Sequence, residues 1–140
     1  MGSSSDEYFS VRSQLRNGVA RIVVQGDLDL GAAPTLDEHL RSLERDGVEA
    51  IILDLRDLSF LDSTGLRALL GASGRASNDG HRLAIVGASG PARRLFEITG
   101  TERILNQPEG LRLLDRFTRG PARRSRGSPE RPEGEVSDRG

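Results

Sequence analysis

Four consecutive residues, Asp62, Ser63, Thr64 and Gly65, have the clearest chemical setting in the sequence. They follow the most apolar run of the chain, residues 51–55, and precede leucines spaced along one helix face. A buried strand therefore ends, and a helix begins, around them. Short polar side chains at such a junction accept hydrogen bonds from the free N–H groups of the first helical turn. The simplest interpretation of Ser63 is thus a helix N-cap.

Nucleophilic catalysis by Ser63 would require a histidine beside it. The only histidines are His39, on the polar side of a predicted helix, and His81, at the start of a predicted strand. The start of that strand is the end opposite to the loop that carries Ser63. A small serine hydrolase is therefore an unfavoured alternative, and we expect no enzyme activity.

Two carboxylates, Asp27 and Asp29, follow a predicted strand within one short loop. Such a pair can bind a metal ion or perform acid–base chemistry, but without further ligands it is more typical of a solvated rim. The segment Gly-Ala-Ser-Gly at 87–90 lacks the lysine of a P-loop and the glycine spacing of a dinucleotide site, so it indicates a turn. We therefore expect no metal and no cofactor on this chain.

Composition excludes further classes of protein. The net charge of -1 gives no general attraction to nucleic acid or to an anionic membrane. The absence of cysteine excludes disulfides and thiolate sites, and the absence of lysine excludes Schiff-base chemistry. No apolar run approaches the roughly 20 residues that span a bilayer. We expect a cytoplasmic protein without nucleic-acid or membrane partners, and the charged surface pattern indicates a monomer.

Strands and helices alternate along the chain. Residues 9–15 have the period-two pattern of a half-exposed strand, Asn17-Gly18 favours a hairpin turn, and residues 19–25 form the return strand. Further strands are predicted at 50–55, 82–86 and 104–105, and helices at 34–45, from the Ser63 junction to about 77, at 91–98 and at 111–117. At 140 residues, the chain fits one α/β domain with parallel crossover connections.

The two ends of the chain differ from its middle. Residues 1–7 are small and polar, which predicts a flexible N-terminus. Residues 118–140 are rich in arginine, proline and glycine and almost free of apolar side chains, which predicts a disordered tail. The run Arg-Arg-Ser-Arg at 123–126 could touch an acidic partner, although a solvated tail explains it as well. The predicted domain is therefore 8–117.

Several segments in order carry a family resemblance: Gly-Asp-Leu-Asp at 26–29, Leu-Asp-Leu at 53–55, Leu-Ser-Phe-Leu-Asp-Ser-Thr-Gly-Leu at 58–66, residues 86–90, and Leu95-Phe96. Over roughly residues 9–117 the chain resembles the bacterial anti-sigma factor antagonists, the small stand-alone members of the STAS domain family. The resemblance implies a mixed sheet of four or five strands with an N-terminal hairpin, and helices mainly on one face. The family often has glutamate where this chain has Asp27, and the charge is kept.

The resemblance also implies a phosphorylation switch. In regulated members of the family, the serine that corresponds to Ser63 is phosphorylated by the cognate anti-sigma factor, a serine kinase that carries the ATP and magnesium. The unphosphorylated antagonist binds this anti-sigma factor and frees the sigma factor, and a metal-dependent serine phosphatase resets the cycle. Thr64 is the less favoured acceptor, because its hydroxyl is expected to serve helix capping or local packing.

We expect the partner to contact Ser63 together with its neighbours, namely Asp27, Asp29, Asp62, Thr64 and Gly65. Gly65 should let the partner backbone approach closely, and tight packing at the helix start is the alternative. A phosphate at a helix N-terminus should leave the fold intact and add negative charge to an acidic cluster, so that the partner no longer fits. A non-enzymatic STAS module of a transport or stress-signalling complex is the other functional alternative.

Overall fold

The computed structural model describes residues 9–105 and 107–119. Its sheet begins with an antiparallel hairpin of β1 (Phe9–Arg16) and β2 (Val19–Leu28). The turn between them has positive φ angles at both Asn17 (55°) and Gly18 (80°). Two such angles in succession are what a two-residue type I′ turn requires. The predicted hairpin is therefore confirmed.

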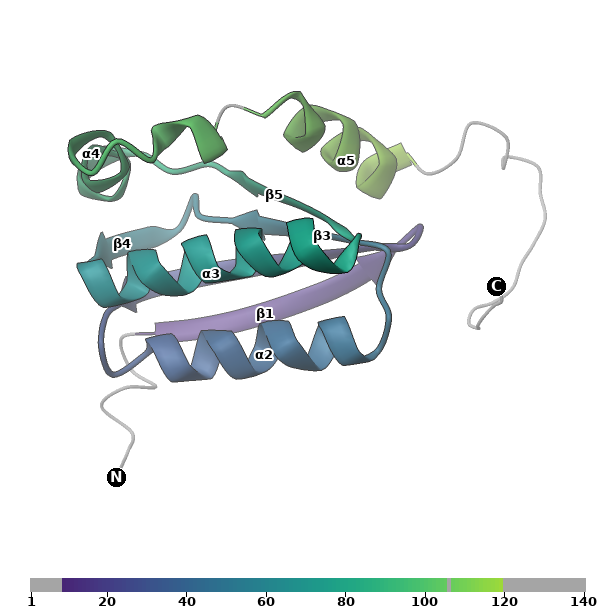
Figure 1. Cartoon of the computed structure of the whole chain (residues 1–140), viewed down its shortest axis with the longest axis horizontal. Coiled ribbons are helices and arrows are strands. Elements are labelled where there is room, and N and C mark those ends of the chain that lie inside the picture. The colour runs from purple at the N-terminus through teal and green to yellow at the C-terminus, as the bar shows by residue number, and fades with distance from the viewer. Residues whose placement is uncertain (1–8, 106, 120–140) are drawn as a thin grey trace.

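The rest of the sheet is parallel to β2. β3 (Ala50–Asp54) pairs with the first half of β2, and β5 (Arg82–Val86) pairs with β3. The strand order is β1-β2-β3-β5, and a fifth strand, β4 (Leu58–Leu61), pairs with the end of β2 (Figure 1). The sheet is thus mixed, as the predicted fold class requires.

β4 is not among the strands predicted from the sequence, where residues 58–61 belong to the junction before the helix. β2 changes its neighbour from β3 to β4 at Gly26, where the pairing register shifts. Gly26 has a φ of 96°, a conformation that favours glycine, and its N–H donates to the carbonyl of Asp57 at 3.1 Å. Beyond β4, the N–H of Asp62 donates to the carbonyl of Leu28 at 3.3 Å. The junction before the helix is therefore fixed to the end of β2.

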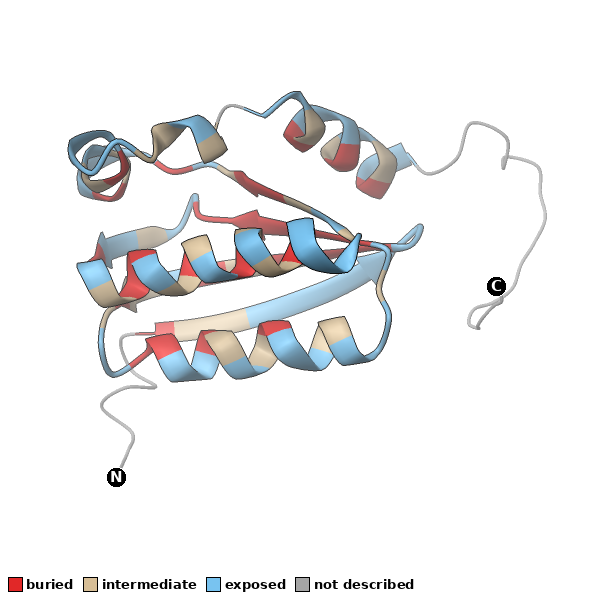
Figure 2. Ribbon diagram, viewed as in Figure 1, coloured by how far each residue is buried: buried red, intermediate tan, exposed pale blue. Residues whose placement is uncertain are grey.

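Helices cover both faces of the sheet (Figure 1). α2 (Ala33–Arg45), α3 (Ser63–Asp79) and α4 (Gly90–Ile98) contribute Leu36, Leu69 and Phe96 to one core. α5 (Pro108–Arg119) packs Leu113 and Phe117 against the opposite face in a smaller core. The buried residues of α3 and α5 lie along the sides that face the sheet (Figure 2). The prediction of helices mainly on one face is confirmed.

Several elements differ from their predicted type or bounds, and three of these differences matter for the site and the tail. Residues 104–105 were predicted as a short strand but belong to the 3-10 helix η1 (Glu102–Leu105), because two apolar residues carry no period that separates strand from helix. β2 extends to Leu28, so Asp27 lies within the strand. α5 includes the first two residues of the predicted tail, Thr118 and Arg119.

The predictions for residues 1–7 and for the tail from 120 onward lie outside the described residues. Within residues 9–105 and 107–119, none of the helices combines the length and the hydrophobicity that crossing a bilayer would require.

Candidate functional site

Ser63 is the first residue of α3, and it is exposed. The N-cap is the residue before it, Asp62, whose Oδ1 accepts a hydrogen bond from the N–H of Gly65 at 2.9 Å. The interpretation of Ser63 as the N-cap is therefore wrong, because Asp62 makes the capping bond. The helix needs no contribution from the Ser63 hydroxyl.

The second carboxylate oxygen of Asp62 connects α3 to the loop that follows β2. Oδ2 accepts a hydrogen bond from the N–H of Leu30 at 3.2 Å. In the same loop, Oδ1 of Asp29 accepts from the N–H of Ala32 at 3.0 Å. Both carboxylates therefore have structural partners. Together they hold the end of β2, its loop and the start of α3 side by side.

The carboxylate of Asp27 belongs to the same end of the molecule, since Asp27 lies opposite Phe60 in the pairing of β2 with β4. The structure thus brings the predicted acidic residues together near Ser63: Asp27 and Asp29 lie at the end of β2 and in its loop, and Asp62 lies just before α3. Among the described residues, no group of three or more histidine, aspartate or glutamate side chains is arranged to hold a metal ion.

Two exposed apolar side chains lie on these same segments. Leu30 is 70% exposed and Phe60 is 46% exposed. Neither was expected at the surface from the sequence, although the alternation from Leu58 to Phe60 could have drawn attention to an aromatic residue at a strand end. Aromatic side chains are enriched in protein interfaces. The surface around Ser63 is therefore amphipathic as well as acidic.

Gly65 is buried against the end of β2. A Cβ atom at this position would lie 2.3 Å from the carbonyl oxygen of Leu28 and 2.9 Å from Cδ1 of Leu61. Close packing therefore accounts for the glycine, in agreement with the second of the two roles expected for it. Its contact with a partner stays a prediction. Thr64 is half-buried beside it.

A buried ion cluster lies away from this site, at the end of β3. Asp54 is 1% exposed, and its Oδ2 accepts from Nη2 of Arg21 at 2.6 Å and from Nη2 of Arg56 at 2.7 Å. Burial alone would raise the pKa of Asp54, but the hydrogen bonds from Arg56 and Arg21 outweigh it and lower the pKa to about 2. Arg21 also lies over the ring of Phe117 in α5, 5.9 Å from its centroid. The cluster is saturated, which indicates a structural role.

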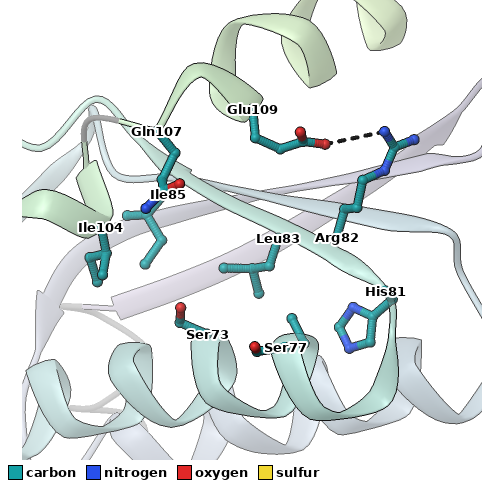
Figure 3. A pocket seen from close by; sticks show the side chains of 10 residues that line it. Ser73, Ser77, His81, Arg82, Leu83, Ile85, Ile104, Gln107 and Glu109 are labelled. Atoms are coloured by element: carbon teal, nitrogen blue, oxygen red, sulfur yellow. Dashed lines mark ion pairs between the residues drawn. The ribbon is translucent and has the colours of Figure 1, made fainter.

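The histidines do not reach Ser63. His39 contacts Ser13 of β1, with Nε2 3.2 Å from the hydroxyl oxygen. His81 lines a cavity of about 300 Å³ beside the last turns of α3, together with Ser73, Ser77 and Glu109 (Figure 3). α3 begins at Ser63 and is 17 residues long, which separates its two ends by roughly 24 Å at 1.5 Å per residue. No catalytic triad is assembled around Ser63 within the described residues.

Comparison with known proteins identifies the domain. The family model for the STAS domain matches residues 10–113. The anti-sigma-B factor antagonist of Staphylococcus aureus is 36% identical over 89 residues, which cover 64% of this chain and 82% of that protein. The corresponding protein of Staphylococcus epidermidis is 33% identical over the same shares of the two chains.

Solved structures agree with the family model. An anti-sigma factor antagonist from Mycobacterium paratuberculosis superimposes with a TM-score of 0.65 at 26% identity, over 79% of this chain and 94% of that one. The phosphorylated form of the Bacillus cell fate determinant SpoIIAA shares the fold, with a TM-score of 0.59 at 22% identity over 77% of this chain and 97% of that one. The chain therefore belongs to the STAS domain family.

Proposed function

We propose that this chain is an anti-sigma factor antagonist that binds a serine-kinase anti-sigma factor when unphosphorylated and is switched off by phosphorylation of Ser63. The observation that carries the proposal is an exposed serine at the first position of α3 whose neighbour, Asp62, already caps the helix. The names of the relatives in Staphylococcus aureus and Mycobacterium paratuberculosis support the same class of function.

The fold of this chain should tolerate a phosphate at Ser63. The N–H groups of Ser63 and Thr64 have no acceptor within α3, because the first N–H groups of any helix precede its first intrahelical bond. These groups and the positive end of the helix dipole favour a nearby anion. Phosphorylation should therefore change the surface and leave the internal packing as it is.

The partner, by contrast, should not tolerate the phosphate. Phosphate adds about -1.5 to -2 charges beside Asp27, Asp29 and Asp62. The exposed side chains of Leu30 and Phe60 would be buried in the complex, so the new charge would lose water at the same interface. A penalty of about 2.7 kcal/mol is enough for a hundredfold loss of affinity. Charge repulsion with desolvation is thus a sufficient mechanism.

The test compares serine variants in binding and phosphorylation assays. The unmodified chain captures its anti-sigma factor, which is identified by mass spectrometry and then purified for titration with Ser63→Ala and Ser63→Asp. We expect Ser63→Ala to bind and to accept no phosphate from the kinase with ATP and magnesium. Ser63→Asp should bind roughly a hundredfold more weakly. Ser42→Asp, an exposed position near the other end of α2, is the matched control and should bind like the unmodified chain.

Each alternative has its own outcome in these assays. Full phosphorylation of Ser63→Ala would move the acceptor to another residue, with Thr64 the first to map. Failure to bind any serine-kinase anti-sigma factor would favour the non-enzymatic module of a transport or stress-signalling complex. Ester or phosphate hydrolysis that disappears in Ser63→Ala would favour the serine hydrolase. The resetting phosphatase is sought with the phosphorylated chain as its substrate.

A further inference from the structure

We propose that Arg67 is the phosphate-pairing residue of this switch: its guanidinium binds the phosphate on Ser63 and holds it along the exposed face of α3. The inference rests on the proposed phosphorylation of Ser63 and assigns a role to a residue that the switch has not involved so far. Arg67 would act on the modified form alone, as a positioning residue.

The helix geometry places the two side chains together. Residues four apart lie one above the other on a helix, and Ser63, Arg67 and Gly71 are all exposed, so they share one solvent-facing stripe of α3. Each Cα–Cβ bond of a helix tilts toward the N-terminus, so a long side chain at position 67 has Ser63 within its reach. An anion that precedes a cation by four residues is also the favourable order for such a pair.

The charges near Ser63 leave Arg67 available for this contact. The second arginine of α3, Arg75, has its Nε 2.9 Å from Oε1 of Glu44 in α2. Arg67, in contrast, forms no ion pair within residues 9–105 and 107–119. The carboxylate nearest to Arg67 in sequence is that of Asp62, and it accepts hydrogen bonds from the N–H groups of Gly65 and Leu30.

Pairing of Arg67 with the phosphate would change the charged surface that the anti-sigma factor contacts. In the unmodified chain, the exposed surface near Ser63 includes the positive charge of Arg67. In the phosphorylated chain, the guanidinium donates to the phosphate oxygens, and the phosphate is held in one orientation above the first turn of α3. The switch would therefore replace a free cation with an ordered anionic pair.

Titration of the phosphate tests the contact directly. Phosphoserine is incorporated at position 63 during translation, and the second pKa of the phosphate is followed by ³¹P NMR in the full chain. A cation that pairs with the dianion lowers this pKa, so Arg67→Gln should raise it by about 0.3 unit relative to the chain with Arg67. Arg67→Lys should keep most of the lowering. High salt should shrink the difference between Arg67 and Arg67→Gln.

The control is Arg45→Gln, an exposed arginine in the last turn of α2, which should leave the pKa unchanged. Equal pKa values for Arg67 and Arg67→Gln would overturn the proposal, and so would an equal rise in Arg45→Gln. Because the phosphoserine is encoded, the result does not depend on any kinase. A failed kinase assay would contradict the proposed function, whereas an unchanged titration would contradict the role of Arg67.

Discussion

At the scale of single residues, the buried ion pairs of Asp54 lie away from the serine. The carboxylate of Asp54 receives hydrogen bonds from two arginines, Arg21 on β2 and Arg56 two residues after the end of β3. It is also buried, so its charge depends on these partners. By comparison, the carboxylate of Asp62 next to Ser63 accepts hydrogen bonds from the backbone N–H groups of Gly65 and Leu30. The domain thus keeps its strong ion pairs out of the surface that we propose to be modified.

Asp54 should make stability depend on pH in acid. Its pKa is lowered from 3.8 to about 2 in the folded state. A carboxylate whose pKa is lower in the folded than in the unfolded state stabilises the fold at pH values above its pKa in the unfolded state. For Asp54 this contribution to the free energy of unfolding is about 2 kcal/mol, and it is lost as the pH falls toward the pKa in the folded state. We expect Asp54→Asn to lower the free energy of unfolding by about 3 kcal/mol at pH 7. At pH 3 the difference in this free energy between Asp54→Asn and the unmodified chain should be smaller by about 1 kcal/mol.

Urea unfolding at a series of pH values measures this gap. Asp115→Asn is the control, since Asp115 is exposed and, among the described residues, pairs only with Arg119 of its own helix. An exposed pair of this kind is worth about 0.5 kcal/mol. A gap between Asp54→Asn and the unmodified chain that stays constant from pH 7 to pH 3 would contradict the electrostatic explanation.

The residue-level site was only partly predictable from sequence. Asp62 and Ser63 are both good capping residues, so their types alone do not say which one caps the helix. The structure decides it through the extended backbone of Asp62 and its bond to Gly65. The contact of Asp54 with Arg21 could not be predicted for another reason: Arg21 is 33 residues away in sequence, and the pairing of β2 with β3 brings it near.

At the scale of elements, two of the three glycines of α3 lie in opposite environments. Gly65 meets the backbone of β2, whereas a Cβ atom added at Gly74 would have nothing within 4 Å of it. Alanine favours a helix over glycine by about 1 kcal/mol. We therefore expect Gly74→Ala to stabilise the domain by up to about 1 kcal/mol, and Gly65→Ala to destabilise it by about 1–3 kcal/mol through overpacking.

Thermal unfolding followed by circular dichroism compares the two substitutions within one helix. The two substitutions should change the stability in opposite directions, because both replace glycine with alanine in the same helix and only the surroundings of the two positions differ. If Gly65→Ala stabilised the domain as much as Gly74→Ala, this result would contradict the close packing of α3 on the end of β2.

Elements with a clear apolar pattern were predicted better than elements without one. The amphipathic pattern of residues 34–45 identified α2, because several side chains agree on one period. The continuous apolar run of 50–55 identified β3, because such a run is typical of a strand buried on both faces. β4 and η1 each have only four residues. In such short segments tertiary pairing decides the conformation, and β4 exists because the end of β2 offers it a partner beyond β3.

At the scale of the whole molecule, the sheet separates two cores of unequal size. The face opposite α2 and α3 depends on α5, whose Leu113 is 1% exposed. We expect Leu113→Ala to lower the free energy of unfolding by about 3 kcal/mol, because truncation of a buried leucine leaves a cavity. Leu111→Ala in the same helix should cost almost nothing, since Leu111 is 76% exposed. Urea unfolding of both variants measures the difference, and equal costs would show that α5 does not pack on the sheet as described.

The end of α5 has a practical consequence for handling the protein. The side-chain amide of Asn17 donates to the carbonyl of Arg116 at 3.1 Å, so α5 ends at the β1–β2 turn. From that turn β2 runs ten residues to Leu28, next to Ser63, a distance of roughly 30 Å. β1, in contrast, starts beside Gly26 at the serine end. A dye, sensor surface or fusion partner joined beyond α5 should leave the serine accessible to a kinase, whereas one joined just before β1 would crowd it.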